Sequence, residues 1–230
     1  LEANPRASRT VPFISKAIGV PIARIAARIM AGEKLKKFNL EKRISNIFAV
    51  KEAVFPFNKF PNVDILLGPE MQSTGEVMGI DENFGLSFAK SQMAAGNDLP
   101  IAGTAFISVK DKDKKNALNF AKKLKELNFK LCATSGTAKY LNTNGINCKK
   151  INKVREGSPH IVESLNAKNI ELVINTTEGS KSISDSYSLR RSALVNKIPY
   201  CTSLAAANAC VEAINSLKNK KITVKAIQEL

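Results

Sequence analysis

Residues 101–230 of this 230-residue chain alternate short apolar runs typical of strands with amphipathic segments typical of helices. The strand-like runs are Thr104–Val109, Phe129–Ala133, Cys148–Ile151, Glu171–Asn175 and Pro199–Cys201, and the helical patterns after them are Lys114–Leu127, Thr137–Asn144, Pro159–Ala167, Ile183–Lys197 and Ala205–Leu217. Repeated strand–helix pairs fold into a parallel sheet with helices on both faces. We therefore predict an α/β fold here, with a Rossmann-like parallel sheet and flanking helices.

Small polar side chains stand at the ends of nearly all the predicted strands. They are Ser108, Thr134 to Thr137, Lys153, Asn175 to Thr177 and Thr202. In such sheets, ligands bind outside the carboxyl ends of the strands. Hydroxyl groups and the free N–H groups of a helix N-terminus suit a phosphate. Ser, Thr and Asn are also good helix N-caps, which would account for any one of them. Their coincidence at four strand ends favours a phosphate-ester pocket.

The first 96 residues read as irregular α+β. Helical spacing of apolar residues predicts a helix that begins after Pro21 and stops near Gly32, and a second from about Asn83 to Ala95. Val50–Phe55 is a short apolar run typical of a strand. Residues 57–79 are rich in Gly and Pro and predict a loop, and residues 96–100 predict a linker.

The first residues form a charged pattern with alternate spacing. In an extended segment Glu2, Asn4 and Arg6 would share one face. Glu and Asn oxygens suit Mg²⁺, and Arg6 and Arg9 could hold a phosphate oxygen. An ordinary strand end with this spacing is the alternative. The pattern resembles the metal-binding end of ATP-grasp ligases.

Charge and cysteine content limit the classes of partner. The net charge is +15, with +4 in residues 1–96 (13 Lys/Arg against 9 Asp/Glu) and +11 in the rest (22 against 11). A basic half suggests an anionic partner, but most of the excess is lysine on amphipathic helices. Because Trp and aromatic stacking motifs are absent, we expect no nucleic acid partner. No apolar stretch approaches the ~20 residues that span a bilayer, so we expect no membrane association.

The four cysteines include no Cys-x-x-Cys pair, and the chain has one histidine. This composition argues against a zinc site of the usual kind and favours buried, reduced thiols.

Four longer motifs resemble known families. They are Ala133–Ala138, Val50–Pro61, Leu67–Gly79, and Ile174–Gly179 followed by Leu189–Leu194. The first resembles the phosphate loop of the methylglyoxal-synthase-like superfamily, which includes IMP cyclohydrolase. The others are similar to the C-terminal end of carbamoyl-phosphate synthase large subunits, and the resemblance runs from Glu2 almost to Leu230.

The resemblance implies a part of a larger ligase. The full subunit of that family uses two ATP, with Mg²⁺ or Mn²⁺, to join bicarbonate and glutamine-derived ammonia into carbamoyl phosphate for arginine and pyrimidine biosynthesis. Residues 1–96 would be the C-terminal part of the carbamate-phosphorylating ATP-grasp half, with Glu2 and Asn4 as metal ligands and Arg6 and Arg9 as catalytic residues. Residues 97–230 would be a methylglyoxal-synthase-like allosteric domain.

Two effector sites follow from the same resemblance. The nucleotide site, which takes UMP or IMP, would consist of Ser108, Lys114, Thr134, Thr137, Lys153, Asn175 and Thr177. Part of an ornithine site would consist of Glu52, Tyr200 and Thr202. The alternative for Glu52 is a solvent-exposed salt bridge with Lys51. The family's effectors differ between lineages, so the resemblance does not choose the nucleotide.

The competing function is a stand-alone enzyme of the methylglyoxal synthase or IMP cyclohydrolase type. Such a lyase needs carboxylate bases beside the phosphate, and we expect only Glu178 and Asp185 nearby. The sequence therefore favours an allosteric domain that binds a nucleotide effector over a stand-alone lyase. We expect the partners to be the rest of the large subunit and a glutaminase small subunit, in a cytoplasmic oligomer of heterodimers. Alone, the chain should be inactive as a ligase.

Overall fold

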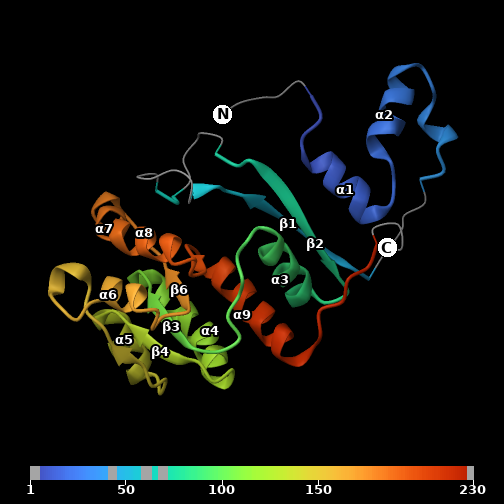
Figure 1. Ribbon diagram of the computed structural model, residues 1–230. Helices are drawn as coiled ribbons and strands as arrows, with labels where there is room; N and C mark the ends of the chain where they lie inside the picture. Colours follow the sequence, from blue (N-terminus) through green and yellow to red (C-terminus); the bar gives the residue numbers. More distant parts are fainter. Residues whose placement is uncertain (1–5, 41–45, 58–63, 67–71, 227–230) are drawn as a thin grey trace.

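The computed structural model describes residues 6–40, 46–57, 64–66 and 72–226. Its centre is a five-stranded parallel sheet in the order β5-β4-β3-β6-β7 (Figure 1). The strands are β3 (Thr104–Ser108), β4 (Lys130–Ala133), β5 (Lys149–Lys150), β6 (Leu172–Asn175) and β7 (Tyr200–Cys201). The predicted α/β architecture and all five strand positions are confirmed.

Six helices and two short 3₁₀ turns connect and follow these strands. They are η3 (Asp111–Asp113), α4 (Lys114–Glu126), α5 (Ser135–Thr143), η4 (Val154–Glu156), α6 (Ile161–Asn166), α7 (Ser180–Asp185), α8 (Tyr187–Val195) and α9 (Leu204–Asn219). The helix predicted over residues 183–197 is two helices, because the chain breaks between α7 and α8 at Ser186.

Alternate residues of the central strand β3 face two separate cores. Ala105 and Ile107 belong to a core with α4, α5 and α9, and Phe106 belongs to a core with α6 and α8. All three side chains are 0% exposed. Full burial of a large apolar side chain contributes about 1.5–3 kcal/mol, and burial on both faces is what a parallel sheet requires. The two cores therefore fix the sheet between its helices.

The amino-terminal part contains a two-stranded antiparallel sheet of β1 (Phe48–Val54) and β2 (Gly75–Asp81), followed by α3 (Phe84–Ala94). The predicted loop over 57–79 is wrong at its end, because β2 begins at Gly75. Gly79 in this strand faces the backbone of α3, and a Cβ there would lie 2.0 Å from the Ser87 carbonyl oxygen. The glycine that suggested a loop is a point of close approach between a strand and a helix.

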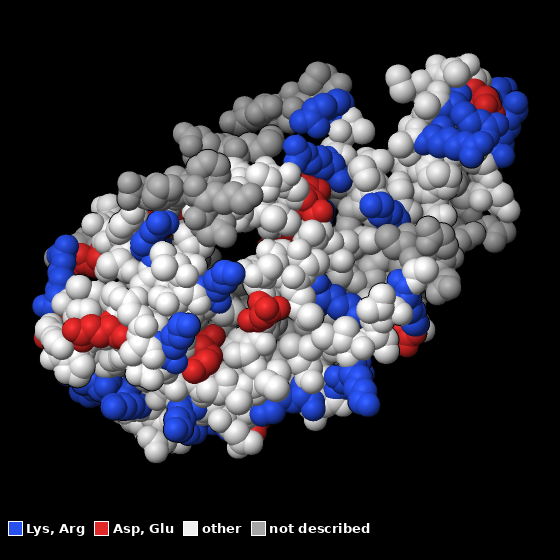
Figure 2. Space-filling model, viewed as in Figure 1, with Lys and Arg blue, Asp and Glu red and all other residues white. Residues whose placement is uncertain are grey.

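Two further helices, α1 (Thr10–Ile18) and α2 (Ile22–Met30), precede this sheet and contain no buried residue, and the turn η1 (Leu35–Lys37) follows them. The second was predicted and the first was not. Lys and Arg side chains gather over α2 and the turn after it (Figure 2). No single described helix is long and apolar enough to cross a membrane, but α1 and α2, bent by 114° at their break, pass the same test as a pair.

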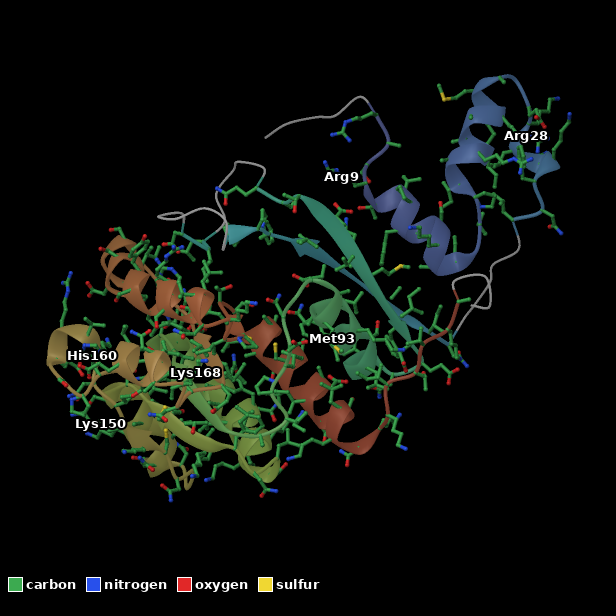
Figure 3. The ribbon with its side chains drawn as sticks, in the orientation of Figure 1. Arg9, Arg28, Met93, Lys150, His160 and Lys168 are labelled. Carbon is green, nitrogen blue, oxygen red and sulfur yellow. The ribbon has the colours of Figure 1, made fainter. Side chains whose placement is uncertain are left out.

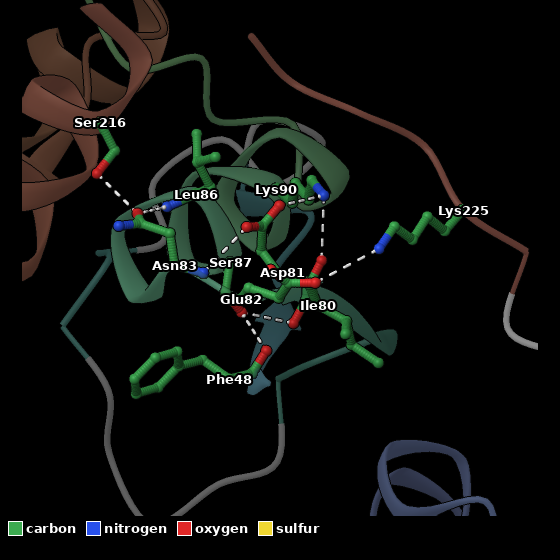
Figure 4. A network of polar contacts seen from close by, with 11 residues as sticks. Phe48, Ile80, Asp81, Glu82, Asn83, Leu86, Ser87, Lys90, Ser216 and Lys225 are labelled. Atoms are coloured by element: carbon green, nitrogen blue, oxygen red, sulfur yellow. Dashed lines mark hydrogen bonds and ion pairs between the residues drawn. The ribbon is translucent and has the colours of Figure 1, made fainter. Parts of the chain in front are cut away.

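Helix α3 attaches this part to the parallel sheet. Asn83 caps α3 by accepting from the Leu86 N–H, and its Oδ1 also accepts from the Ser216 hydroxyl of α9 (Figure 4). Ala89 lies in the same core as β3. The segment predicted as a linker has no helix or strand, but its Leu99 is buried in that core. The two parts therefore share one core.

The four cysteines are free and buried, as predicted. Burial raises the pKa of Cys132 to about 12 and that of Cys148 to about 11. Both are therefore protonated thiols near neutral pH.

Gly85 tests the contact between α3 and α9. A Cβ at this position would lie 2.3 Å from Ser216 Oγ and 2.7 Å from the Glu212 carbonyl oxygen. We expect Gly85→Ala to lower the free energy of unfolding by about 1–3 kcal/mol through overpacking, as measured by urea denaturation. Gly75→Ala is the control, because nothing lies within 4 Å of its Cβ position. Equal stability of the two variants would contradict this packing.

Candidate functional site

A cavity of about 820 Å³ lies at the carboxyl end of the parallel sheet. Six of the seven residues predicted to bind a nucleotide line it: Ser108, Lys114, Thr134, Thr137, Lys153 and Asn175. Thr177 is not among the lining residues. Thr176 takes its place, and its hydroxyl accepts a hydrogen bond from the Lys110 N–H. We call this space the phosphate cavity.

The first turn of α5 forms one wall of the phosphate cavity. Thr134 is the N-cap residue and makes no side-chain cap bond, and Ser135, Gly136 and Thr137 follow it in the lining. The first N–H groups of a helix have no partner within the helix and carry a partial positive charge. A Cβ on Gly136 would lie 3.3 Å from Lys114 Nζ, so glycine lets the ammonium approach the loop. Helix terminus and cation together suit an anion.

Three hydroxyls meet beside this helix terminus. Thr134 Oγ1 donates to Ser108 Oγ at 3.3 Å and lies 3.5 Å from Thr137 Oγ1. The Val109 N–H donates to Thr137 Oγ1 at 3.3 Å. Thr134 is 7% exposed and Thr137 is 2% exposed. A phosphate here would exchange water for hydroxyls that are already fixed in place.

Carboxylates pair with the cations around the phosphate cavity. Lys114 pairs with Asp111 at 2.6 Å, and Lys112 pairs with Glu178. The hydrogen bond from Lys114 lowers the pKa of Asp111, and that from Lys112 lowers the pKa of Glu178. A bound anion would therefore compete with these carboxylates for the lysines.

The prediction that only Glu178 and Asp185 lie nearby is wrong. Asp111 and Glu156 also line the phosphate cavity. Both belong to 3₁₀ turns, which apolar periodicity does not reveal. Asp185 is itself paired with Arg155 at 2.9 Å.

A second cavity, of about 550 Å³, lies between β1, α3 and β7, and Glu52, Tyr200 and Thr202 all line it. Glu52 accepts a hydrogen bond from Gln92 Nε2 at 2.9 Å and forms no ion pair with any described residue. Burial raises its pKa, although the Gln92 hydrogen bond opposes the shift. Lys51 pairs instead with Glu76 at 3.3 Å. The alternative of a salt bridge between Glu52 and Lys51 is therefore wrong.

Tyr200 stands between the two cavities. Its hydroxyl oxygen accepts from Asn175 Nδ2 at 2.6 Å. Burial raises the pKa of Tyr200 to about 12, against the opposing effects of Asn175 and Arg190. Arg190 is 1% exposed and donates to Asp64 through Nε at 2.7 Å and also through Nη2. Sequence reasoning missed this ion pair, because a lone Arg in a helix and a lone Asp in a loop carry no signal of pairing.

The remaining predicted site residues lie at the amino terminus. Arg6 is exposed, and Arg9 is the N-cap residue of α1 (Figure 3). Glu2 and Asn4 lie outside the described residues. Among the residues described, no group of three or more His, Cys, Asp or Glu side chains could hold a metal ion.

Comparison of the sequence with known proteins identifies the family that it resembles. A model of the MGS-like domain family matches residues 116–202. The carbamoyl phosphate synthase large chain of Mesorhizobium japonicum is 56% identical over 235 residues, covering 100% of this chain and 20% of that protein. The large chain of Methanobrevibacter smithii is 55% identical over 230 residues, covering 100% of this chain and 22% of that one.

The chain belongs to the carbamoyl phosphate synthase large chain family. The resemblance expected from the motifs is thereby confirmed, as is the methylglyoxal-synthase-like α/β fold of the C-terminal part. The chain spans about a fifth of the length of these relatives.

A crystal structure of methylglyoxal synthase from Elizabethkingia anophelis aligns with 49% of this chain and 79% of its own, at 20% sequence identity and a TM-score of 0.41. That likeness is too distant to bear on function.

The buried pair of Arg190 and Asp64 predicts a large effect of a small change. Asp64→Asn leaves the guanidinium buried without its counter-charge, so the free energy of unfolding should fall by about 3–5 kcal/mol. Glu33→Gln, which breaks the exposed pair with Arg28, is the matched control and should change stability little. Urea denaturation near neutral pH measures both.

The stability difference between the parent and Asp64→Asn should depend on pH. Burial of Asp64 opposes its ionisation, but hydrogen bonds and charge from Arg190 outweigh this and lower its pKa in the folded state. The stabilisation is therefore complete above the unfolded pKa of about 4 and is lost as the pH falls through the folded pKa. The stability gap between the parent and Asp64→Asn should narrow in acid. A gap that widened in acid would contradict the assignment.

Proposed function

We propose that this chain is the regulatory C-terminal part of a glutamine-dependent carbamoyl phosphate synthase large chain, and that the phosphate cavity binds a nucleoside monophosphate such as UMP or IMP. The observation that carries the proposal is the meeting of the α5 N-terminus, three hydroxyls and Lys114 at one end of the sheet. A volume of about 820 Å³ is of the size that accommodates a ligand as large as a nucleotide.

Each lining residue has a chemical role in this proposal. Lys114, Thr134 and Thr137 hold the phosphate with the α5 N-terminus, and Lys153 adds charge from the exposed side. Asn175, with Thr176 in place of the expected Thr177, gives neutral hydrogen bonds to the rest of the nucleotide. A nucleotide that binds one state of the enzyme more tightly than another would shift the equilibrium between the two states. The coupling free energy would be about 1–3 kcal/mol.

The second cavity is proposed to bind ornithine in part. Glu52, half-buried and without a cation among the described residues, would meet the ligand's ammonium. Tyr200 and Thr202 would take its other polar groups. Because an ammonium would stabilise the Glu52 carboxylate, binding should lower the raised pKa of Glu52.

The whole protein is proposed to act as an ATP-dependent ligase in the cytoplasm, for arginine and pyrimidine biosynthesis. Glu2 and Asn4 would hold Mg²⁺ or Mn²⁺, and Arg6 and Arg9 would lie near the phosphate transferred from ATP. The metal would screen the phosphate charge, while the arginines would orient it. The partners would be the rest of the large chain and a glutaminase small subunit, in an oligomer of heterodimers.

The stand-alone lyase is not supported by the carboxylates at the phosphate cavity. Asp111, Glu178 and Asp185 each pair with a Lys or Arg, and Glu156 accepts a hydrogen bond from the Lys153 N–H. A general base works best with a pKa near the operating pH, whereas the pKa values of Asp111 and Glu178 are lowered. We infer a binding role for this cavity.

Calorimetric titration with UMP and IMP tests the nucleotide site. We expect binding of at least one of them and no measurable binding of uridine or inosine, since the phosphate supplies the charge that Lys114 and α5 recognise. Equal binding of the unphosphorylated nucleosides by the folded chain would rule out the phosphate site.

Substitution of the two proposed lysines gives an independent test. Lys114→Ala and Lys153→Ala should each weaken nucleotide binding about tenfold or more, because each removes a charge-assisted contact. Lys115→Ala and Lys150→Ala are matched controls, since neither side chain lines the cavity. If the controls weaken binding as much as the test variants do, the effect is one of overall charge and the assignment fails.

A further inference from the structure

Two thiols from different elements meet in the interior of the protein. Cys201, the last residue of β7, donates a hydrogen bond through its Sγ to the Sγ of Cys210 in α9, at 3.3 Å. Both cysteines are free, and their exposed fractions are 3% and 5%. A disulfide has an Sγ–Sγ distance of about 2.05 Å. The two sulfur atoms are therefore already in contact, and a small approach of the side chains brings them to bonding distance.

Both cysteines also line the second cavity, the space of about 550 Å³ between β1, α3 and β7. Of the described residues that line this cavity, only Glu52 carries a charge. A space of this volume admits a small uncharged oxidant such as hydrogen peroxide. The two thiols can thus be reached from the cavity while the core stays folded.

The other two cysteines give an internal comparison. Cys132 and Cys148 are buried to the same extent, with 5% and 4% exposed, but neither is among the residues that line the phosphate cavity or the second cavity. Cys148 Sγ donates instead to the Lys149 carbonyl oxygen at 3.8 Å. Burial alone would make all four thiols alike, whereas the cavity and the sulfur contact distinguish Cys201 and Cys210.

The reaction open to this pair is a two-electron oxidation. One thiol, once ionised, attacks an oxygen of hydrogen peroxide, the O–O bond breaks, the sulfur becomes a sulfenic acid, and the departing hydroxide takes up the thiol proton as water. The second thiol, once ionised, attacks the sulfenic sulfur, so the Sγ–Sγ bond forms and a second water leaves. The two thiols together lose two hydrogens and two electrons, and the peroxide is reduced to two waters.

The surroundings of the pair affect the rate of this reaction. The hydrogen bond to Cys210 and burial raise the pKa of Cys201. Because the thiolate is the reactive form, oxidation should be slow near neutral pH. Once a sulfenic acid has formed, the contact with the second sulfur favours the disulfide over further oxidation.

We propose that Cys201 and Cys210 form a redox-sensitive modification site, at which a peroxide that enters the second cavity produces a reversible disulfide between β7 and α9. The disulfide closes a loop that contains Thr202 and the first turns of α9. Tyr200 and Thr202 flank Cys201 and line the same cavity, so oxidation fixes one wall of the second cavity. A small thiol such as glutathione reverses the reaction by thiol–disulfide exchange.

Peptide mapping of the whole chain tests the disulfide. Trypsin releases both cysteines in one peptide, residues 198–218, and places Cys132 and Cys148 in two other peptides. The chain is treated with hydrogen peroxide, and the remaining thiols are capped with N-ethylmaleimide in denaturant. We expect an uncapped peptide 198–218 that is two hydrogens lighter, and its formation should be about fivefold faster or more than oxidation of Cys132 or Cys148. Dithiothreitol should restore both thiols.

Serine variants identify the two partners. Cys201→Ser and Cys210→Ser should each abolish the lighter peptide, and Cys132→Ser is the matched control that should retain it. Circular dichroism verifies that the variants are folded. Oxidation of all four thiols at one rate would mean that the reaction needs unfolding, which overturns the site. A parent chain that keeps both thiols of peptide 198–218 after prolonged exposure to peroxide also overturns it.

Amide hydrogen exchange tests the effect on the cavity wall. A cross-link between a strand and a helix restricts local opening, so exchange in the first half of α9 should become about threefold slower or more in the oxidised chain. Cys210→Ser, treated with peroxide in the same way, should show no such slowing. If the disulfide forms and exchange in α9 is unchanged, oxidation does not fix the wall and the proposal fails. These experiments use no nucleotide or ornithine, so they are independent of the proposed function.

Discussion

Burial of the central strand on both faces is the constraint on which the rest of the structure depends. Ala105, Phe106 and Ile107 of β3 are 0% exposed, and helices cover them from two sides. A polar side chain within such a strand would lose water without a partner. Polar residues therefore begin where the strands end. Since parallel strands end at the same edge, Ser108 and Asn175 become neighbours in one cavity although they lie far apart in the sequence.

The strand ends could be predicted from the sequence, and the contacts across the two parts could not. The alternation of apolar runs and helical patterns gives the position of each strand of the parallel sheet, because periodicity is local. The same reasoning misread Gly79 as part of a loop, since nothing in the sequence shows that Ser87 packs against it. The sequence predicts Thr177 as a binding residue, whereas Thr176 lines the cavity, because the turn after the strand decides which side chain points into it. The pair of Arg190 and Asp64 joins residues 126 positions apart, and single-sequence patterns carry no information at that distance.

Electrostatic balance links the fold to the proposed regulation. The phosphate cavity keeps its lysines in ion pairs with Asp111 and Glu178. These pairs are partly exposed, and such pairs contribute little to stability, so an anion can displace them at small cost. In the pair of Arg190 and Asp64 the guanidinium is buried and the carboxylate is partly exposed, so removing the carboxylate would leave a buried charge without a partner. The ion pairs at the phosphate cavity can therefore open for an anion, while the pair of Arg190 and Asp64 remains in place.

The central claim is that a nucleotide phosphate binds at the N-terminus of α5. Nuclear magnetic resonance of the ¹⁵N-labelled chain tests it most directly, through the backbone amide signals of Ser135, Gly136 and Thr137 during titration with UMP. The account predicts that these amides show the largest shifts of any in the chain and that uridine at the same concentration leaves them in place. Saturable UMP binding that shifts amides elsewhere, with these three unmoved, would contradict it.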